Sequence, residues 1–143
     1  NNPFGKRIEG IVKMYRRLSA KVAETLEDNL FPIVISGDHS NGGATIAGIK
    51  QAFPKKRLGV VWIDAHADLR PEYEGSSLSH ASVMARIRET GADAVQIVIR
   101  SMCMDERNII RDKNLSVYTG LHPLYLEEKA SMPSEIRNMY FSL

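Results

Sequence analysis

The stretch LGVVWIDAHAD, residues 58–68, decides the fold of this chain. It begins with a short apolar run, residues 58–63, that is rich in β-branched residues and contains a tryptophan. Such a run predicts a strand buried on both faces of a sheet. The two aspartates and the histidine that follow it therefore predict a functional site at the carboxyl end of a buried strand.

Apolar patterns on both sides of this stretch predict an α/β protein. Apolar residues at steps of three and four indicate helices, and continuous apolar runs indicate further strands. The expected elements, by residue number, are helix 6–30, strand 31–36, helix 45–53, strand 58–63, helix 79–90, strand 94–99, helix 105–113, strand 115–119 and a fifth strand at 139–143. Because strands that alternate with helices imply right-handed crossovers, we expect a three-layer αβα fold with a mostly parallel sheet and helices on both faces.

The composition is typical of a single globular domain covering residues 1–143. The chain is 43% hydrophobic and 25% charged, and its formal net charge is +2, so a packed core is expected. Basic residues are scattered, which argues against a nucleic-acid partner. The sequence shows no signal-peptide pattern or membrane-spanning run, and its one cysteine, Cys103, cannot form an internal disulfide. We therefore expect a cytoplasmic protein without a membrane partner.

Asp64, His66 and Asp68 bring three potential metal ligands close together. Side chains of an extended segment alternate, so these three would project to one side while the alanines between them face the other. Two carboxylates and an imidazole at the end of an apolar strand would suffer from charge repulsion and lost hydration unless a cation neutralised them. The pattern therefore predicts a metal site.

A second polar group, SGDHS at residues 36–40, follows the expected strand 31–36. If the two strands are neighbours, His39 lies beside the 64–68 motif. Oxygen and imidazole ligands without thiolate suit Mn²⁺ or a similar dication better than a structural zinc. Each motif alone has a structural explanation, since Asp38 or Asp64 could cap the following helix and His39 could be a hydrogen-bonded loop residue. Their joint occurrence at equivalent strand ends favours the metal site.

The two motifs, in this order along the chain, resemble those of the ureohydrolase family, which includes arginase, agmatinase and formimidoylglutamase. The similarity runs from Phe31 to Met104. The segments DAHADLR, YEG, SHASVM and QIVIRSM, at 64–70, 73–75, 79–84 and 96–102, look more like agmatinases, whereas ISGDHSN at 35–41 is similar to some bacterial arginases. The agmatinase-like branch is therefore favoured, with arginase and formimidoylglutamase as alternatives.

The resemblance implies an enzyme that hydrolyses guanidino C–N bonds, releases urea and uses two Mn²⁺ ions. His39 and Asp68 would bind the first ion and His66 the second, and Asp64 would bridge both. Two such ions lower the pKa of a shared water, so that it can attack the guanidino carbon at neutral pH. His80 matches the position that passes a proton to the leaving amine, although without the resemblance it would be interpreted as a histidine at a helix start. The implied partner is a small guanidino substrate, and the family commonly forms homo-oligomers.

Three features depart from the family pattern. Ser36 replaces a glycine, and Arg70 stands where arginases usually have asparagine, which weakens the case for an α-amino-acid substrate. The family also completes both metal shells with an Asp-x-Asp pair after a later strand, and no such pair occurs in these 143 residues. We therefore expect a fragment that stops before this pair and is poorly active or inactive alone. A truncated non-catalytic member and an arginase-fold deacetylase with a single zinc are the alternatives, and the Asp-Ala-His-Ala-Asp spacing argues against the second.

Overall fold

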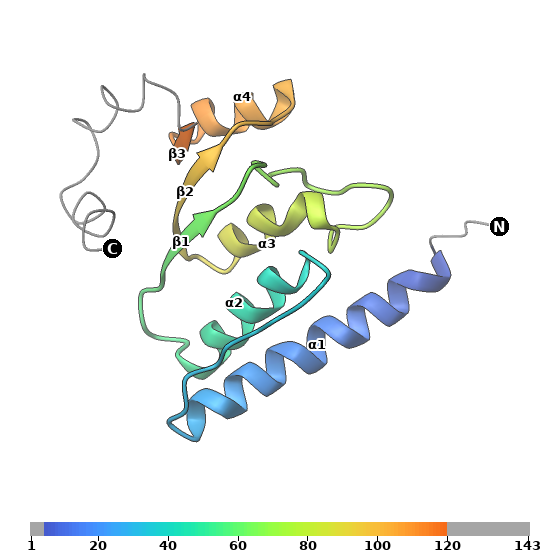
Figure 1. The fold of residues 1–143 in the computed structure, drawn as a ribbon, viewed down its shortest axis with the longest axis vertical. Coiled ribbons are helices and arrows are strands. Elements are labelled where there is room, and N and C mark those ends of the chain that lie inside the picture. The colour runs from blue at the N-terminus through green and yellow to red at the C-terminus, as the bar shows by residue number, and fades with distance from the viewer. Residues whose placement is uncertain (1–4, 120–143) are drawn as a thin grey trace.

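The computed structural model describes residues 5–119. In chain order the elements are α1 (Gly5–Glu27), α2 (Asn41–Ala52), β1 (Gly59–Ile63), the 3₁₀-helix η1 (His80–Ser82), α3 (Val83–Glu89), β2 (Asp93–Ile99), α4 (Met104–Asp112) and β3 (Ser116–Thr119). Figure 1 shows the strands side by side, with α1 packed along α2 at one side of the molecule. No helix within this described range is long and apolar enough to cross a bilayer. The strand predicted at 139–143 lies outside the described residues.

The three strands form one parallel sheet in the order β1-β2-β3. β1 and β2 pair from Gly59 opposite Asp93 to Ile63 opposite Ile97. α3 connects β1 to β2 and α4 connects β2 to β3, as expected for parallel neighbours. The predicted α/β class with a parallel sheet is therefore confirmed, and each of these strands begins within one residue of its predicted start.

The core lies between the sheet and the helices. Val60 of β1 is buried against Met84 of α3, and Trp62 packs against the same cluster. The alternate residues of β1, Val61 and Ile63, are 45% and 71% exposed. β1 is thus buried on one face in the described structure, and the prediction that both of its faces are covered is wrong for these residues.

The strand predicted at residues 31–36 is not formed. The segment runs beside α1 and pairs with no strand among residues 5–119 (Figure 1). Phe31, Ile33 and Ile35 are 87%, 79% and 94% exposed. A strand needs a neighbour for its backbone N–H and C=O groups, and no such neighbour lies within the described range. The apolar pattern that predicted burial therefore produces an exposed apolar face.

The contact between α1 and α2 depends on the absence of a side chain at Gly48. A Cβ atom at this position would lie 2.4 Å from the carbonyl oxygen of Ser19 and 2.8 Å from Cβ of Val22. The Ser19 hydroxyl also donates a hydrogen bond to the Ala44 carbonyl at 2.9 Å, which joins the two helices at the same place. Neither backbone can withdraw without breaking this contact.

We expect Gly48→Ala to lower the free energy of unfolding by about 2 kcal/mol, because overpacking a closed contact forces the backbones apart. Gly10→Ala on α1 is the matched control, since no neighbouring atom lies within 4 Å of the added Cβ. There the higher helix propensity of alanine should raise the free energy of unfolding by about 0.5–1 kcal/mol. Urea unfolding followed by circular dichroism measures both, and effects of the same sign would contradict the packing argument.

The end of β2 is irregular in a way that connects it to the residues after β1. The pairing with β3 shifts between Gln96 and Ile99, and Val98 has a φ of +70°, which is rare for a β-branched residue. Just beyond this bulge, Ser101 forms a parallel bridge with His66. Bulges redirect the chain at such positions, and here the result is that the segments following both strands run side by side.

Candidate metal centre

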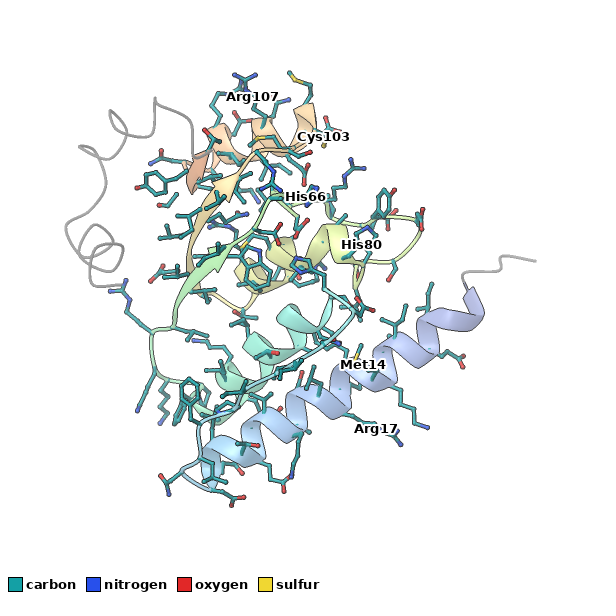
Figure 2. All side chains as sticks on the ribbon, viewed as in Figure 1. Met14, Arg17, His66, His80, Cys103 and Arg107 are labelled. Carbon is teal, nitrogen blue, oxygen red and sulfur yellow. The ribbon has the colours of Figure 1, made fainter. Side chains whose placement is uncertain are left out.

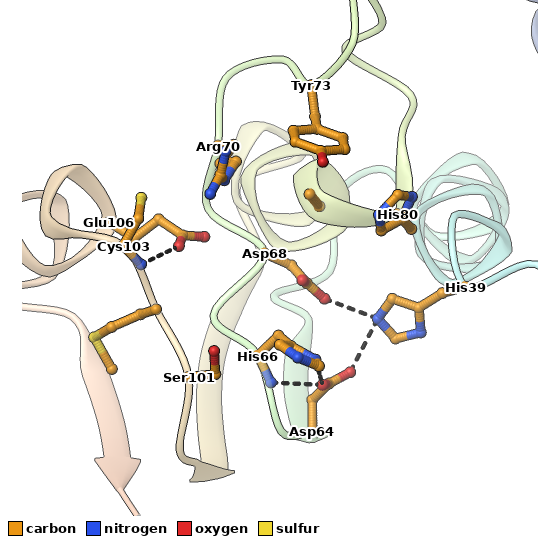
Figure 3. A pocket seen from close by; sticks show the side chains of 12 residues that line it. His39, Asp64, His66, Asp68, Arg70, Tyr73, His80, Ser101, Cys103 and Glu106 are labelled. Atoms are coloured by element: carbon orange, nitrogen blue, oxygen red, sulfur yellow. Dashed lines mark hydrogen bonds and ion pairs between the residues drawn. The ribbon is translucent and has the colours of Figure 1, made fainter.

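His39, in the turn before α2, points toward two carboxylates that follow β1. Its Nε2 lies 2.8 Å from Oδ2 of Asp68 and 2.9 Å from Oδ2 of Asp64. Figure 3 shows the three side chains converging on one point. One ligand atom from each lies within 4.8 Å of the others. The structure thus brings His39 to the 64–68 motif, as the sequence predicts, even though the segment before it is not a strand.

Asp38 holds the turn that carries His39. Its Oδ1 accepts a hydrogen bond from the Ser40 N–H at 2.9 Å, and its own N–H donates to the Ser36 hydroxyl at 3.1 Å. The His39 ring packs 5.3 Å from the ring of Trp62, centroid to centroid. Asp38 therefore stabilises the turn but does not cap α2, whose N-cap residue is Ser40 without a side-chain cap. The Trp62 ring limits where the imidazole can lie.

The carboxylates of Asp64 and Asp68 both lie against Nε2 of His39, although the two residues have different backbone conformations. Asp64 follows β1 directly, and its Oδ1 accepts the N–H of His66 at 2.7 Å. Asp68 has a φ of +52°, so the regular alternation expected over residues 64–68 is broken there. Asp68 is also buried. Burial raises the pKa of Asp68 above its usual range, the hydrogen bond from His39 opposes this rise, and the neighbouring Asp64 carboxylate adds to it.

The donor set is suited to a dication. Two carboxylates and an imidazole converge, and within residues 5–119 neither Asp64 nor Asp68 pairs with a lysine or an arginine. Two adjacent carboxylates with one histidine between them leave negative charge without a fixed counter-charge. Hard-to-borderline ions such as Mn²⁺ accept oxygen and imidazole ligands, so the residues present fit the ion that the sequence predicts.

His66 lies beside this three-residue cluster and is not part of it. Its Nδ1 is 3.6 Å from Oδ1 of Asp64, and its side chain is 66% exposed. Figure 3 shows the ring next to Asp64. Of the three side chains predicted to lie together, Asp64 and Asp68 do so, and His66 approaches only Asp64.

An open cavity of about 490 Å³ joins the cluster to His80. Figure 2 locates His66 beyond the end of β1 and His80 just before α3. The His80 ring lies edge-on to Tyr73 with 5.4 Å between centroids, and the guanidinium carbon of Arg70 is 5.1 Å from the same Tyr73 ring. The other side chains lining the cavity include Ser101, Met102, Cys103 and Glu106.

Glu106 is a cavity residue that the sequence analysis did not identify. It is only 5% exposed although it carries a carboxylate. A signal for it was present, because an acidic residue at the third position of a helix that begins just after a strand is typical of helix capping. Its burial and its partners, however, depend on segments that are distant in the sequence.

The raised pKa of Asp68 predicts a pH-dependent stability for the metal-free protein. The carboxyl is protonated in both folded and unfolded chains at low pH, and stability is lost as the pH rises through the higher folded pKa. We expect Asp68→Asn to melt a few degrees above the wild type at pH 7, a difference that shrinks below about pH 4. Calorimetry in the presence of a chelator measures this, with the exposed Asp105→Asn as control. A lower melting temperature for Asp68→Asn at pH 7 would contradict the assignment.

Comparisons with known proteins identify the family of the chain. The arginase family model matches residues 6–132, so the chain belongs to the arginase family. Among curated proteins, the N(1)-aminopropylagmatine ureohydrolase of Synechocystis sp. is 34% identical over 125 residues, covering 85% of this chain and 38% of that protein. The arginase of Bacillus caldovelox is 29% identical over 131 residues, covering 80% of this chain and 43% of that protein.

Solved structures show the same relationship. The arginase from Medicago truncatula superimposes with a TM-score of 0.69 at 31% identity, covering 75% of this chain and 34% of that one. The agmatine ureohydrolase of Thermoplasma volcanium gives a TM-score of 0.66 at 26% identity, covering 76% and 36%. The predicted family resemblance is confirmed. The chain spans about two fifths of the length of the curated relatives described above.

Proposed function

We propose that the protein to which this chain belongs hydrolyses the guanidino group of a small cationic compound, first of all agmatine or an agmatine derivative, and releases urea. The observation that carries this proposal is the convergence of His39, Asp64 and Asp68 on one cavity in a chain of the arginase family. The agmatine branch is supported by the 34% identity to an aminopropylagmatine ureohydrolase, against 29% to an arginase.

The proposed cofactor is a pair of Mn²⁺ ions. His39 and Asp68 would hold the first ion, His66 the second, and Asp64 both. When bound, the ions supply Lewis acidity that makes a shared water nucleophilic at neutral pH. We further propose that an Asp-x-Asp pair elsewhere in the whole protein completes both shells, because the 143 residues contain no such pair.

The cavity beside the proposed ions would hold the substrate, and His80 would move its proton. In the reaction the water oxygen bonds to the guanidino carbon and the bond from that carbon to the alkyl nitrogen breaks. His80 delivers a proton to the departing nitrogen, so the products are urea and a protonated amine. His80 is exposed to the cavity, as such a transfer requires.

Urea release by the whole protein loaded with Mn²⁺ tests the proposal. Agmatine, arginine and other guanidino compounds are compared at equal concentration, with a chelator-treated sample as control. Turnover of agmatine or a derivative is the expected result. Preference for arginine would move the protein to the arginase branch, and no urea from any compound at full Mn²⁺ occupancy would overturn the assignment.

Two further expectations remain predictions. Assembly into a homo-oligomer rests on the family resemblance, and a cytoplasmic location rests on the composition with its single cysteine. Light scattering on the whole protein tests the first, and cell fractionation tests the second.

A further inference from the structure

Asp68 has a left-handed backbone conformation that its surroundings impose. Residues other than glycine keep a φ such as its +52° only where neighbouring contacts over-determine it. The Ala67 N–H donates to the Ser101 carbonyl at 3.3 Å, and the Asp68 carbonyl accepts from the Ala85 N–H at 3.1 Å. The orientation of this carboxylate is therefore set by residues outside the 64–68 motif.

Glu106 supplies the contact immediately after Asp68. Its Oε1 accepts the N–H of Leu69 at 3.0 Å, and its Oε2 accepts the N–H of Cys103 at 2.8 Å. Glu106 belongs to α4 and lies 37 residues along the chain from Leu69. A buried carboxylate is costly unless its oxygens are hydrogen-bonded, and here two backbone N–H groups meet this need.

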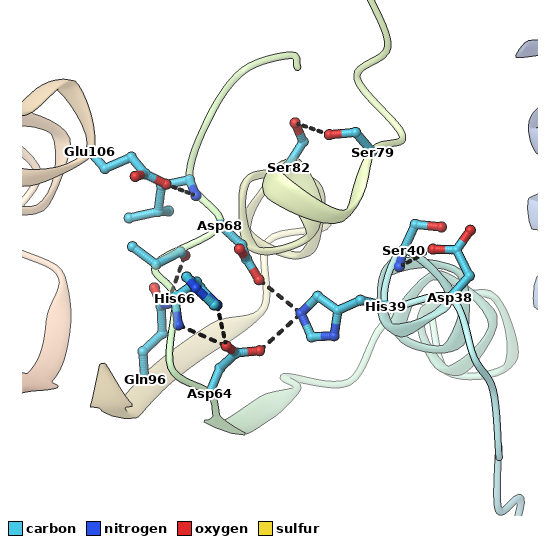
Figure 4. A network of polar contacts seen from close by, with 12 residues as sticks. Asp38, His39, Ser40, Asp64, His66, Asp68, Ser79, Ser82, Gln96 and Glu106 are labelled. Carbon is cyan, nitrogen blue, oxygen red and sulfur yellow. Dashed lines mark hydrogen bonds and ion pairs between the residues drawn. The ribbon is translucent and has the colours of Figure 1, made fainter. Parts of the chain in front are cut away.

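Helix capping alone does not explain Glu106. A glutamate at the third helical position needs one oxygen for the N–H of the capping residue, here Cys103. Asp105, one position earlier on the same turn, carries the same charge and is exposed to solvent. Glu106 is instead turned inward, and Figure 4 shows its carboxylate against the loop next to Asp68.

Gln96 holds the opposite side of Asp68. It is fully buried in β2, and its Nε2 donates to the Ala67 carbonyl at 2.8 Å. A carbonyl oxygen can only accept, so the amide must present its nitrogen here. The peptide groups before and after Asp68 are thus held by two buried side chains, Gln96 from the sheet and Glu106 from α4.

We propose that Glu106, with Gln96 as its partner, is a positioning residue for the metal centre. Its bond to Leu69 fixes the peptide group that follows Asp68 and so holds the Asp68 carboxylate against His39. This inference rests on the proposed function, in which Asp68 binds the first ion. Groups that orient a ligand in this way typically change metal affinity or activity about 10–100-fold when they are replaced.

Glu106→Gln in the whole protein tests this role. Glutamine keeps the length of the side chain and one acceptor, but its NH₂ group would face the second backbone N–H, so one of the two bonds is lost. The Mn²⁺ dissociation constant, measured by isothermal titration calorimetry, should rise about 10–100-fold. At saturating Mn²⁺ the kcat for urea release should fall while KM changes less than about twofold. Hydrogen exchange at the Leu69 amide should become faster in the metal-free protein.

Two variants of α4 serve as controls. Asp105→Asn removes an exposed carboxylate one position away and should leave Mn²⁺ affinity and Leu69 exchange unchanged. Ile109→Val shortens a side chain packed against the core cluster, which includes Leu69, and lowers stability without removing a hydrogen bond of the loop. If Ile109→Val weakened Mn²⁺ binding as much as Glu106→Gln does, the effect of Glu106 would be general stability, and the positioning role would be overturned.

The readouts separate this inference from the proposed function. Weaker Mn²⁺ binding together with faster Leu69 exchange in Glu106→Gln supports the positioning role whichever substrate is used. A wild type that binds Mn²⁺ but releases no urea overturns the proposed function alone. Unchanged Mn²⁺ affinity in Glu106→Gln together with faster Leu69 exchange overturns the positioning role alone, and a wild type that binds no Mn²⁺ overturns both.

Discussion

Asp64→Asn is expected to lower the kcat of the whole Mn²⁺-loaded protein by about 10³-fold or more, because the residue proposed to bridge both ions loses its charge. Asp64 contacts both histidines: Oδ2 lies 2.9 Å from Nε2 of His39, and Oδ1 lies 3.6 Å from Nδ1 of His66. No other carboxylate within residues 5–119 pairs with both. Urea release gives kcat, and elemental analysis gives the bound Mn²⁺, which should also fall.

Asp93→Asn is the matched control for this substitution. Asp93 begins β2, at the end of the sheet away from the cavity, and forms an exposed ion pair with Arg57. Exposed pairs contribute about 0–1 kcal/mol to stability, so the variant should fold and turn over normally. An Asp64→Asn protein within tenfold of the wild type would refute the bridging assignment.

His66→Ala is expected to reduce the bound Mn²⁺ from two ions to one and the activity by about 10²-fold or more, while the fold stays intact. The side chain is 66% exposed, and its one ion-pair partner within the described range is Asp64, so little packing is lost. Elemental analysis measures the metal content, and thermal unfolding of the chelated protein measures the fold.

His80→Ala provides the comparison for His66→Ala. His80 lines the same cavity beside Tyr73 and does not belong to the cluster of His39, Asp64 and Asp68, so its replacement should lower activity and leave both ions in place. The His66→Ala and His80→Ala proteins would then differ in the number of bound Mn²⁺ ions and not only in the rate of urea release. Two ions bound to His66→Ala would contradict the proposed ligand set.

Local sequence patterns were sufficient for most of the fold and for part of the site. The β-branched run at 58–63 and the helical spacing within residues 6–30 reflect intrinsic chain geometry, and both elements are observed. The approach of His39 to the aspartates was expected from two neighbouring strand ends, and it is observed although residues 31–36 form no strand. The backbone conformation of Asp68 was not expected, because alternation presumes an extended chain. The left-handed φ occurs where Glu106 of α4 and Gln96 of β2 hydrogen-bond to the adjoining peptide groups.

The error at residues 31–36 has a different cause. An apolar run indicates what a segment would bury, but strand formation needs a partner whose position no local pattern encodes. The same limit applies to β1, where the apolar residues predicted burial of both faces and one face is exposed. The pairing of a strand and the burial of its faces depend on tertiary contacts. The positions where the helices and strands begin and end are largely set by the local sequence.

The exposed apolar side chains at Phe31, Ile33 and Ile35 have a consequence for the biosynthesis of this polypeptide. Together with Val61 and Ile63 on β1, they resemble surfaces that attract other unfolded chains. Exposed apolar patches of this kind promote association between chains while folding is incomplete. We therefore expect chaperones to bind them at that stage, and residues 1–143 produced alone to form inclusion bodies.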